Sequence, residues 1–304
     1  MEELLLSLCI PTNGVIEWVL PVLESIYEQK VDEKKFEVVV SDNGDNAFFA
    51  KKMKEYCDKY PNIIYIKNNS VGFLNQIESF RHAHGKFIKF INHRMKLKED
   101  ALLELLSFIE QNLEQKPIVF FSNGKLKLGQ CINDFRTFDD FVYNLTYWSS
   151  WSAGLGIWKE DFERMPQDLE YSILFPHTTI LFHEKKRERY IIHNGILLEE
   201  ILTEEVQKGR YDLFKAFAVD YLIILGGLLS AEDISSRTFM KIKKDNLDFI
   251  AWLYCEFVVF RKRCSYDLSG YKDSIEVFYS DKAVKRKLPC IILKKIFSKL
   301  TRKL

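Results

Sequence analysis

The sequence predicts an α/β fold in which a mainly parallel sheet is flanked by helices and followed by a helical appendage. Two observations lead to this prediction: short apolar runs alternate with stretches of helical periodicity up to about residue 120, and the periodicity is helical throughout after residue 195. The 304 residues are 47% hydrophobic and 29% charged, enough apolar material for one large domain or two smaller ones. This composition excludes a disordered chain, a collagen-like fibre and a disulfide-stapled miniprotein.

The alternation of strand and helix can be followed along the first third of the chain. The first expected strand, residues 4–10, is ended by Pro11, and the second, residues 36–40, by the turn-forming sequence SDNGD. Alternation at this spacing is typical of βαβ units, so we expect parallel strands that are covered on both faces. The further expected strands are residues 63–66, 87–91 and 117–121, and the expected helices are residues 15–28, 47–60, 71–84 and 98–115.

The chain is expected to have three parts. They are a domain at residues 1–195, a helical region at 196–281 and a basic tail at 282–304. Helices of the second part are expected at residues 197–208, 211–229 and 245–261. Its most apolar stretch contains Lys215 and Asp220, which leave an apolar run too short for a bilayer span. The N-terminus begins with acidic rather than basic residues, so we expect no signal peptide either.

Polar residues follow four of the expected strands, at residues 11–13, 41–45, 67–72 and 92–94. In open α/β sheets ligands bind beyond the carboxyl ends of the strands, so we expect these loops to meet and form a site. Since loops are generally polar, each loop alone is also compatible with no function. Asp42 is the best-placed candidate, because a carboxylate there can accept from a ribose hydroxyl or a base N–H. The first turn lacks the glycines of GxGxxG, which disfavours NAD or FAD binding.

Five motifs occur in order along residues 4–195: LCIPTN (8–13), VVSDNGD (39–45), KNNSVGFLN (67–75), AHGKFIKFI (83–91) and SAGLGIW (152–158). In this order they resemble the motifs of family 2 glycosyltransferases, which have the Rossmann-like GT-A fold. The resemblance implies sugar transfer from a nucleotide-activated donor to an acceptor hydroxyl, with inversion at the anomeric carbon. It also implies that Thr12 and Asp42 hold the nucleoside. The donor-binding candidates are Pro11, Thr12, Asn13, Asp42, Asn43, Asn69, Gly72, Asn92 and His93.

The sequence departs from the family where the Asp-x-Asp metal motif should follow the fourth strand. It has Asn92, His93 and Arg94 there, and this set lacks the carboxylate oxygens that Mg²⁺ or Mn²⁺ prefers. Mg²⁺ or Mn²⁺ is still a possible cofactor, although the usual Asp-x-Asp ligands are absent. The sequence therefore predicts no metal-binding residue. Our hypothesis is that the Arg94 guanidinium stabilises the departing diphosphate instead. The alternative is that Arg94 is a solvated charge in a protein that has lost catalysis.

An inverting transferase needs a general base to deprotonate the acceptor hydroxyl. The resemblance implies an acidic residue shortly after the SAGLGIW motif, which makes Asp168 and Glu170 the first candidates. His177 is a further candidate because Pro176 indicates a helix N-terminus there. Trp148 and Trp151 belong to an aromatic cluster that is either core or a platform for an acceptor sugar. The six histidines and six cysteines show no metal-ligand spacing, and the cysteines are expected to be reduced in the cytosol.

The tail combines basic and apolar residues. Residues 282–304 contain nine basic residues and no acidic one, whereas the rest of the chain has 35 basic against 43 acidic residues. The apolar residues near one helical stripe are Ile291, Ile292, Leu293, Ile296, Phe297 and Leu300. This pattern predicts a helix that lies on an anionic membrane surface. The alternative is a helix that docks on the protein's own acidic body or on a partner.

These expectations combine into one prediction of function. The chain is expected to be a cytoplasmic glycosyltransferase, peripheral on the inner face of the cell membrane, that helps to assemble capsule or other surface polysaccharide or lipopolysaccharide. Its partners would be a nucleotide-sugar donor and a glycan or polyprenyl-linked acceptor, and not nucleic acid. The alternative is a non-catalytic nucleotide-sugar or glycan-binding subunit of an active transferase. The motifs leave the donor, the acceptor and the oligomeric state open.

Overall fold

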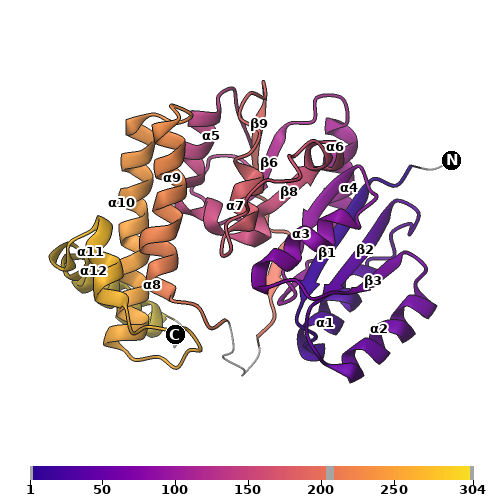
Figure 1. Cartoon of the computed structure of the whole chain (residues 1–304), viewed down its shortest axis with the longest axis horizontal. Helices are drawn as coiled ribbons and strands as arrows, with labels where there is room; N and C mark the ends of the chain where they lie inside the picture. Colours follow the sequence, from indigo (N-terminus) through magenta and orange to yellow (C-terminus); the bar gives the residue numbers. More distant parts are fainter. Residues whose placement is uncertain (1–2, 203–208, 302–304) are drawn as a thin grey trace. The chain divides into compact units, whose positions relative to one another are not determined.

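The computed structural model describes residues 3–202 and 209–301, which divide into two compact units (Figure 1). Unit 1 comprises the chain up to Phe141 together with Trp148–Leu202, and unit 2 comprises Val142–Tyr147 and the chain after residue 202. The boundary therefore lies beyond the expected residue 195. The part of the tail that is described belongs to the helical unit.

Unit 1 is built on an eight-stranded sheet of strand order β3-β2-β1-β4-β8-β6-β9-β7. Strands β1 to β4 and β6 are parallel, as predicted, and β9, which was not predicted, is parallel to β6; β8 and β7 run antiparallel to their neighbours. A separate antiparallel pair joins β5 to β10. The strands are β1 (Leu6–Thr12), β2 (Phe36–Asp42), β3 (Ile63–Lys67), β4 (Phe87–Phe90), β5 (Met95–Leu97), β6 (Ile118–Phe121), β7 (Ile132–Phe135), β8 (Leu155–Trp158), β9 (Tyr190–His193) and β10 (Leu198–Glu200).

Two groups of helices cover this sheet. In the first group, α1 (Ile16–Tyr27) adjoins α2 (Ala47–Lys59) through stacked Tyr27 and Tyr60 rings, and α4 (Ala101–Asn112) through a hydrogen bond from the Leu102 N–H to Gln29. In the second group, α3 (Asn75–Arg81) and α6 (Lys159–Glu163) meet through the edges of Phe80 and Phe162, and α7 (Pro176–Leu181) packs beside α3. Successive side chains of a strand point to opposite faces of the sheet, and every residue of β2 is buried. Both faces of the sheet are therefore covered at β2, one by each group of helices.

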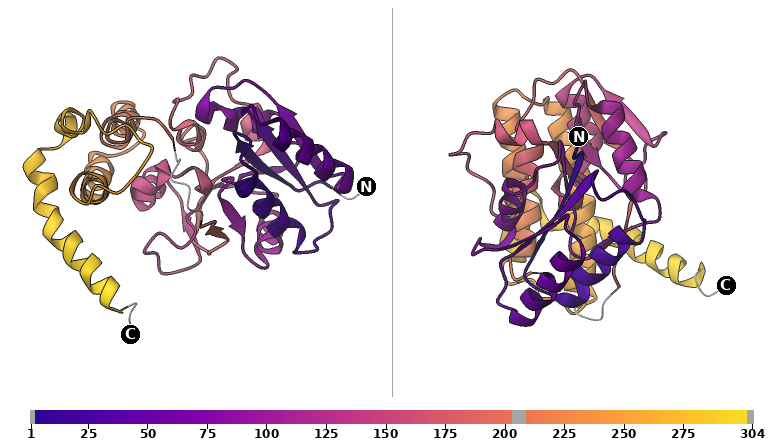
Figure 2. Two further views of the ribbon diagram at one scale, coloured as in Figure 1. Left: turned by 90° about the horizontal axis from the view of Figure 1, so that it is seen from below. Right: turned by 90° about the vertical axis from the view of Figure 1, so that its right-hand side faces the viewer.

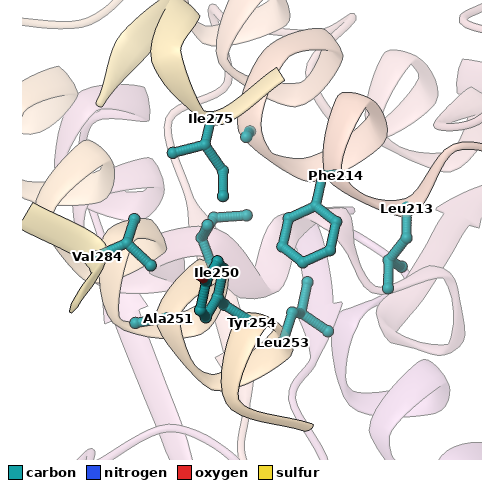
Figure 3. Packing of buried hydrophobic residues seen from close by; sticks show 9 residues of the cluster. Leu213, Phe214, Ile250, Ala251, Leu253, Tyr254, Ile275 and Val284 are labelled. Carbon is teal, nitrogen blue, oxygen red and sulfur yellow. The ribbon is translucent and has the colours of Figure 1, made fainter. Parts of the chain in front are cut away.

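Unit 2 is helical, as the sequence predicts. Its elements are α8 (Leu213–Lys215), η4 (Ala216–Asp220), α9 (Tyr221–Ser230), α10 (Ser236–Leu253), η5 (Tyr254–Val259), α11 (Tyr271–Phe278) and α12 (Asp281–Thr301), with the end of α5 (Phe138–Leu145). The buried core gathers around Phe214, Ile250 and Ile275, and Val284 of α12 packs into it (Figure 3). The second half of α12 extends past the other helices of this unit (Figure 2). Helix α10 begins earlier than expected because the Ser235 side chain caps it, accepting from the Thr238 N–H.

Two expectations for the second part of the chain are corrected. The helix expected at 197–208 is wrong in its first part, because residues Leu198–Glu200 form β10 and pair with β5; residues 203–208 lie outside the described part. Residues Leu213–Ser230 form an uninterrupted helix of 18 residues with a mean hydropathy of 1.7, long and apolar enough to cross a membrane by length and composition. Its charged residues therefore do not exclude a span, although 44% of it is buried, as in a core helix.

Candidate functional site

The four loops predicted to form a site do lie at one edge of the sheet. Strands β1 to β4 are parallel neighbours, so the segments that follow them, residues 12–14, 42–46, 67–72 and 91–94, leave the sheet on the same side. We call these segments the carboxyl-end loops. Hydrogen bonds join them: the Asn43 N–H donates to the Thr12 carbonyl, and the Asn68 N–H donates to the Asp42 carbonyl.

Asp42 is fully buried at the end of β2. Its carboxylate accepts hydrogen bonds from the Gly44 N–H at 2.8 Å and from the Tyr65 hydroxyl at 2.9 Å, and the Lys67 ammonium lies 3.8 Å away. Burial, followed by the interaction with Asp42, raises the pKa of the Tyr65 phenol, so the phenol stays a donor at neutral pH. Tyr65 was not among the predicted residues. Its position in β3, directly beside β2, is the signal that could have identified it.

A network of buried amides holds the first three carboxyl-end loops together. The Asn75 amide donates to the carbonyls of Thr12 and Ser41, and its oxygen accepts from the Ser41 hydroxyl and the Asn68 amide, with all four distances between 2.7 and 3.1 Å. Asn75 ends the third motif, but the sequence alone did not assign it a role. The network fixes the ends of β1 and β2 relative to each other.

The first and fourth carboxyl-end loops meet at Thr12 and His93. Nδ1 of His93 lies 3.0 Å from the Thr12 hydroxyl, which also accepts from the Gly14 N–H. The imidazole packs against Trp18 of α1 at 4.9 Å, and the Arg94 guanidinium lies over the same indole, 3.7 Å from its ring centroid. Burial and the neighbouring Arg94 lower the pKa of His93 to about 3, so His93 is neutral and Arg94 is the cation of this turn.

The other predicted residues of these loops are more exposed. Pro11 is part of β1, and the Asn43 amide donates to the Ser70 carbonyl at 2.7 Å. Asn13, Asn69 and Gly72 are exposed. A side chain at Gly44 would place its Cβ 1.9 Å from the Asn13 carbonyl oxygen, so only glycine fits between these two loops.

The comparisons with known proteins agree with this arrangement. Residues 7–134 match the family described as Glycosyl transferase family 2. The chain is 25% identical over 109 residues to the rhamnosyltransferase WbbL of Escherichia coli K12, a match that covers 33% of this chain and 39% of WbbL. The N-terminal part of the chain therefore matches glycosyltransferase family 2. The resemblance inferred from the sequence motifs is thereby confirmed over these residues.

The fold of this chain is also found in solved structures. The structure of residues 1–349 of S. aureus TarS in complex with UDP-GlcNAc matches with a TM-score of 0.62 at 15% identity, covering 90% of this chain and 80% of that one. The UDP complex of the same protein matches with a TM-score of 0.55 at 14% identity, covering 85% and 75%. These likenesses confirm the predicted GT-A fold.

The turn that replaces the family's Asp-x-Asp motif does not fit a divalent cation. The Asn92 side-chain oxygen already accepts from the Arg94 N–H at 3.0 Å, and Nδ1 of His93 faces the Thr12 hydroxyl. Arg94 adds a permanent positive charge at the position where a cation would have to bind. Hard cations need several oxygen ligands, which Asn92, His93 and Arg94 do not supply.

The general-base candidates lie between α6 and the first turn of α7. Asp168 and Glu170 are exposed in the segment between α6 and α7. His177 is buried at the start of α7, where its Nε2 donates to the Ser150 carbonyl at 2.8 Å. Burial lowers its pKa to about 4, which makes His177 a weak base at neutral pH. Their assignment as the base stays a prediction.

The last of the five motifs is anchored by a buried lysine that the sequence analysis did not single out. Lys89 of β4 is fully buried, and its ammonium donates to the carbonyls of Ala153, Leu155 and Phe90. A Cβ at Gly154 would fall 2.1 Å from the Phe120 ring, which explains why glycine stands there. Nearby Trp148 and Trp151 are partly exposed and meet edge to face at 6.0 Å.

Proposed function

We propose that the chain transfers a sugar from a nucleotide-activated donor to a glycan or polyprenyl-linked acceptor during polysaccharide synthesis. The observation that carries this proposal is the convergence of Asp42 and Arg94 on the carboxyl-end loops of a family 2 fold. The curated relative is named a rhamnosyltransferase, and solved complexes of TarS contain UDP-GlcNAc or UDP. These names support a nucleotide sugar as the donor.

Asp42 is proposed to recognise the nucleoside. Its carboxylate is held in one orientation by the Gly44 N–H and the Tyr65 hydroxyl, at the end of β2. A fixed buried acceptor discriminates well between partners, because a nucleoside without a matching donor leaves the carboxylate incompletely bonded. Lys67, 3.8 Å from Asp42 and partly exposed, adds a positive charge for a phosphate or ribose oxygen.

Arg94 is proposed to stabilise the leaving nucleoside diphosphate without a divalent cation. Departure of the diphosphate develops negative charge, and a guanidinium offers a planar fork of donors that suits phosphate oxygens. The indole of Trp18 supports the guanidinium on one face at 3.7 Å, so its orientation is set before the donor binds. Transfer would invert the anomeric carbon, with Asp168 or Glu170 proposed as the base for the acceptor hydroxyl.

The C-terminal helix is proposed to hold the enzyme on the inner face of the cell membrane. Exposed apolar side chains lie on the second half of α12: Leu293 is 55% exposed, Ile296 50% and Phe297 64%. The first half of the helix does not share this exposure, because Leu288 and Ile291 pack against the core of unit 2. The predicted residues Lys299, Leu300, Arg302 and Lys303 lie outside the part whose side chains are described.

Some of the basic residues of α12 support the alternative of docking on the protein itself. Lys287 pairs with Asp248 at 2.7 Å, and Lys295 pairs with the buried Glu256. Lys287 lies in the first half of the helix and Lys295 in the second, so both halves are held to unit 2, while Leu293, Ile296 and Phe297 stay exposed. One helix can thus pair with its own unit through basic side chains and still present exposed apolar side chains to lipid.

The experiment that tests the proposed function is a donor screen with turnover. UDP-, GDP-, CDP- and dTDP-sugars are added to the full chain, and thermal stabilisation and release of free nucleotide are measured. We expect one nucleotide class to stabilise the protein and to be consumed slowly. Asp42→Asn should lose stabilisation, whereas Asp45→Asn, its fully exposed neighbour, should keep it.

The same screen separates the enzyme from the alternative. Stabilisation without consumption, with or without a lipid-linked acceptor, would favour a nucleotide-sugar-binding subunit of another transferase. Stabilisation by no nucleotide sugar, or equal stabilisation of the Asp42→Asn variant, would contradict the proposed site itself.

A further inference from the structure

A second cluster of reactive side chains lies apart from the carboxyl-end loops. It consists of Glu104 of α4, Cys131 just before β7 and His193 at the end of β9. One potential ligand atom from each residue, a carboxylate oxygen, a thiol sulfur and an imidazole nitrogen, lies within 4.8 Å of the other two. Nε2 of His193 and the Glu104 carboxylate are 3.2 Å apart. None of these three residues belongs to the proposed donor site.

The backbone and the aromatic core hold this cluster in place. Strands β7 and β9 pair with Ile132 opposite His193, and the Asn194 N–H donates to the Cys131 carbonyl at 2.6 Å. The His193 ring is fixed by two neighbours, Phe108 edge-on at 5.5 Å and Phe121 at 5.2 Å. The imidazole is therefore oriented toward Glu104 without help from a ligand.

Gly195 keeps the space between the three side chains open. A Cβ at this position would lie 2.8 Å from the Glu104 carboxylate oxygen, 2.8 Å from Cε1 of His193 and 3.1 Å from the Cys131 sulfur. The three side chains thus converge on the point where any other residue would place its first carbon. A cavity of about 350 Å³ adjoins the cluster, lined also by Asn112 and Arg189.

We infer that Glu104, Cys131 and His193 bind a zinc ion at this point, with the fourth coordination position open toward the cavity. Sulfur, nitrogen and oxygen ligands from three residues are the donor types that zinc accepts in tetrahedral sites. A thiolate disfavours Mg²⁺ and Ca²⁺, which take oxygen ligands. Binding deprotonates the Cys131 thiol and releases one proton, so the zinc, the thiolate and the carboxylate together carry no net charge. The ion would tie α4 to the ends of β7 and β9.

The zinc site could not be predicted from the spacing of its residues along the sequence. Cys131 and His193 are 62 positions apart, and the cysteines and histidines of the sequence show no metal-ligand spacing. The pairing of β7 with β9 brings them together, and the sequence alone did not predict either strand.

The test uses the full chain, freed of metal by a chelator and titrated with Zn²⁺ alone by calorimetry. We expect one zinc ion per chain, and Co²⁺ in its place should give the absorption of a thiolate-bound tetrahedral ion. Cys131→Ser and Glu104→Gln should each weaken zinc binding at least about tenfold. Both residues are exposed, so neither change should unfold the protein. Gly195→Ala keeps all three ligands and should also weaken binding, because its methyl group fills the site.

Two matched variants serve as controls. Cys290→Ser removes another exposed thiol, and Glu78→Gln breaks a carboxylate–imidazole pair with His82 of similar distance, 3.1 Å, outside the cluster. Both should bind zinc like the parent protein. The inference would be overturned by a chain that takes up no zinc, by Co²⁺ without a thiolate band, or by zinc affinity unchanged in both Cys131→Ser and Gly195→Ala. None of these results depends on sugar transfer, so the zinc site and the proposed function can fail separately.

Discussion

Replacing Asn75 by alanine removes the side chain that joins the first three carboxyl-end loops. The variant loses four hydrogen bonds: two that the Asn75 amide donates to the Thr12 and Ser41 carbonyls, and two that its oxygen accepts from Ser41 and Asn68. At about 1 kcal/mol each, reduced by local relaxation, the free energy of unfolding should fall by about 2–4 kcal/mol. Because Thr12 and Asp42 lose their alignment, affinity for the donor nucleotide should fall at least about tenfold.

Two further variants separate the hydrogen bonds from the volume of the side chain. Asn75→Asp keeps the volume and the acceptor oxygen but turns the two donated bonds into contacts between a carboxylate and carbonyl oxygens. It should therefore be at least as harmful as alanine. Asn246→Ala removes a fully buried asparagine of unit 2, which donates to the Phe217 carbonyl and the Tyr279 hydroxyl, and should lower stability without changing donor affinity.

Stability is measured by urea unfolding, followed by tryptophan fluorescence and circular dichroism, and donor affinity by calorimetry. A loss below about 1 kcal/mol for Asn75→Ala, or an Asn75→Asp protein as stable as the parent, would refute the role given to the amide network. Equal loss of donor affinity in Asn246→Ala would show that the effect is not local to the carboxyl-end loops.

Three further predictions concern other parts of the chain. Gly44→Ala places a Cβ 1.9 Å from the Asn13 carbonyl oxygen, so nucleotide-induced stabilisation should disappear; retention of full donor affinity would contradict the fit described here. Burial lowers the pKa of Lys89 from its ordinary 10.5 to about 7, so the unfolded chain binds more protons above pH 7 and Lys89 makes stability rise with pH. Melting temperatures between pH 6.5 and 8.5 should show this rise relative to Lys89→Met, and parallel curves would refute it. Replacing three exposed residues of α12 by serine should move the protein from membrane pellet to supernatant with an unchanged melting temperature, and an unchanged distribution would exclude lipid contact; they are Leu293, Ile296 and Phe297.

Local sequence patterns predicted the part of the fold that local physics determines. The buried strands β1 to β4 and the helices between them were expected, because apolar runs and helical periodicity are properties of neighbouring residues. Strands β7, β8 and β9 have four residues each and depend on partners far along the chain. The helix expected from residue 197 became β10 because pairing with β5 outweighs the helical pattern.

The residues of the candidate site were likewise predicted only in part. Asp42, Thr12 and Arg94 were identified because they follow strands whose ends meet at one edge. Trp18 was not identified, because its role depends on the packing of α1 beside the turn that carries Arg94. His177 lies at a helix start, as expected. Burial lowers its pKa, and its Nε2 donates to the Ser150 carbonyl, so the contacts of His177 are those of a structural residue.

The most direct test of the central claim, that the Arg94 guanidinium replaces the divalent cation, is the rate of donor consumption in the presence of EDTA. With the donor found in the screen, the parent protein should keep its rate in EDTA. Arg94→Ala should lose about 10²–10³-fold in kcat, while Arg81→Ala, a change in an exposed ion pair of α3, should leave kcat unchanged. Activity that requires added Mn²⁺ or Mg²⁺, or an Arg94→Ala enzyme that turns over at the parent rate, would contradict the account.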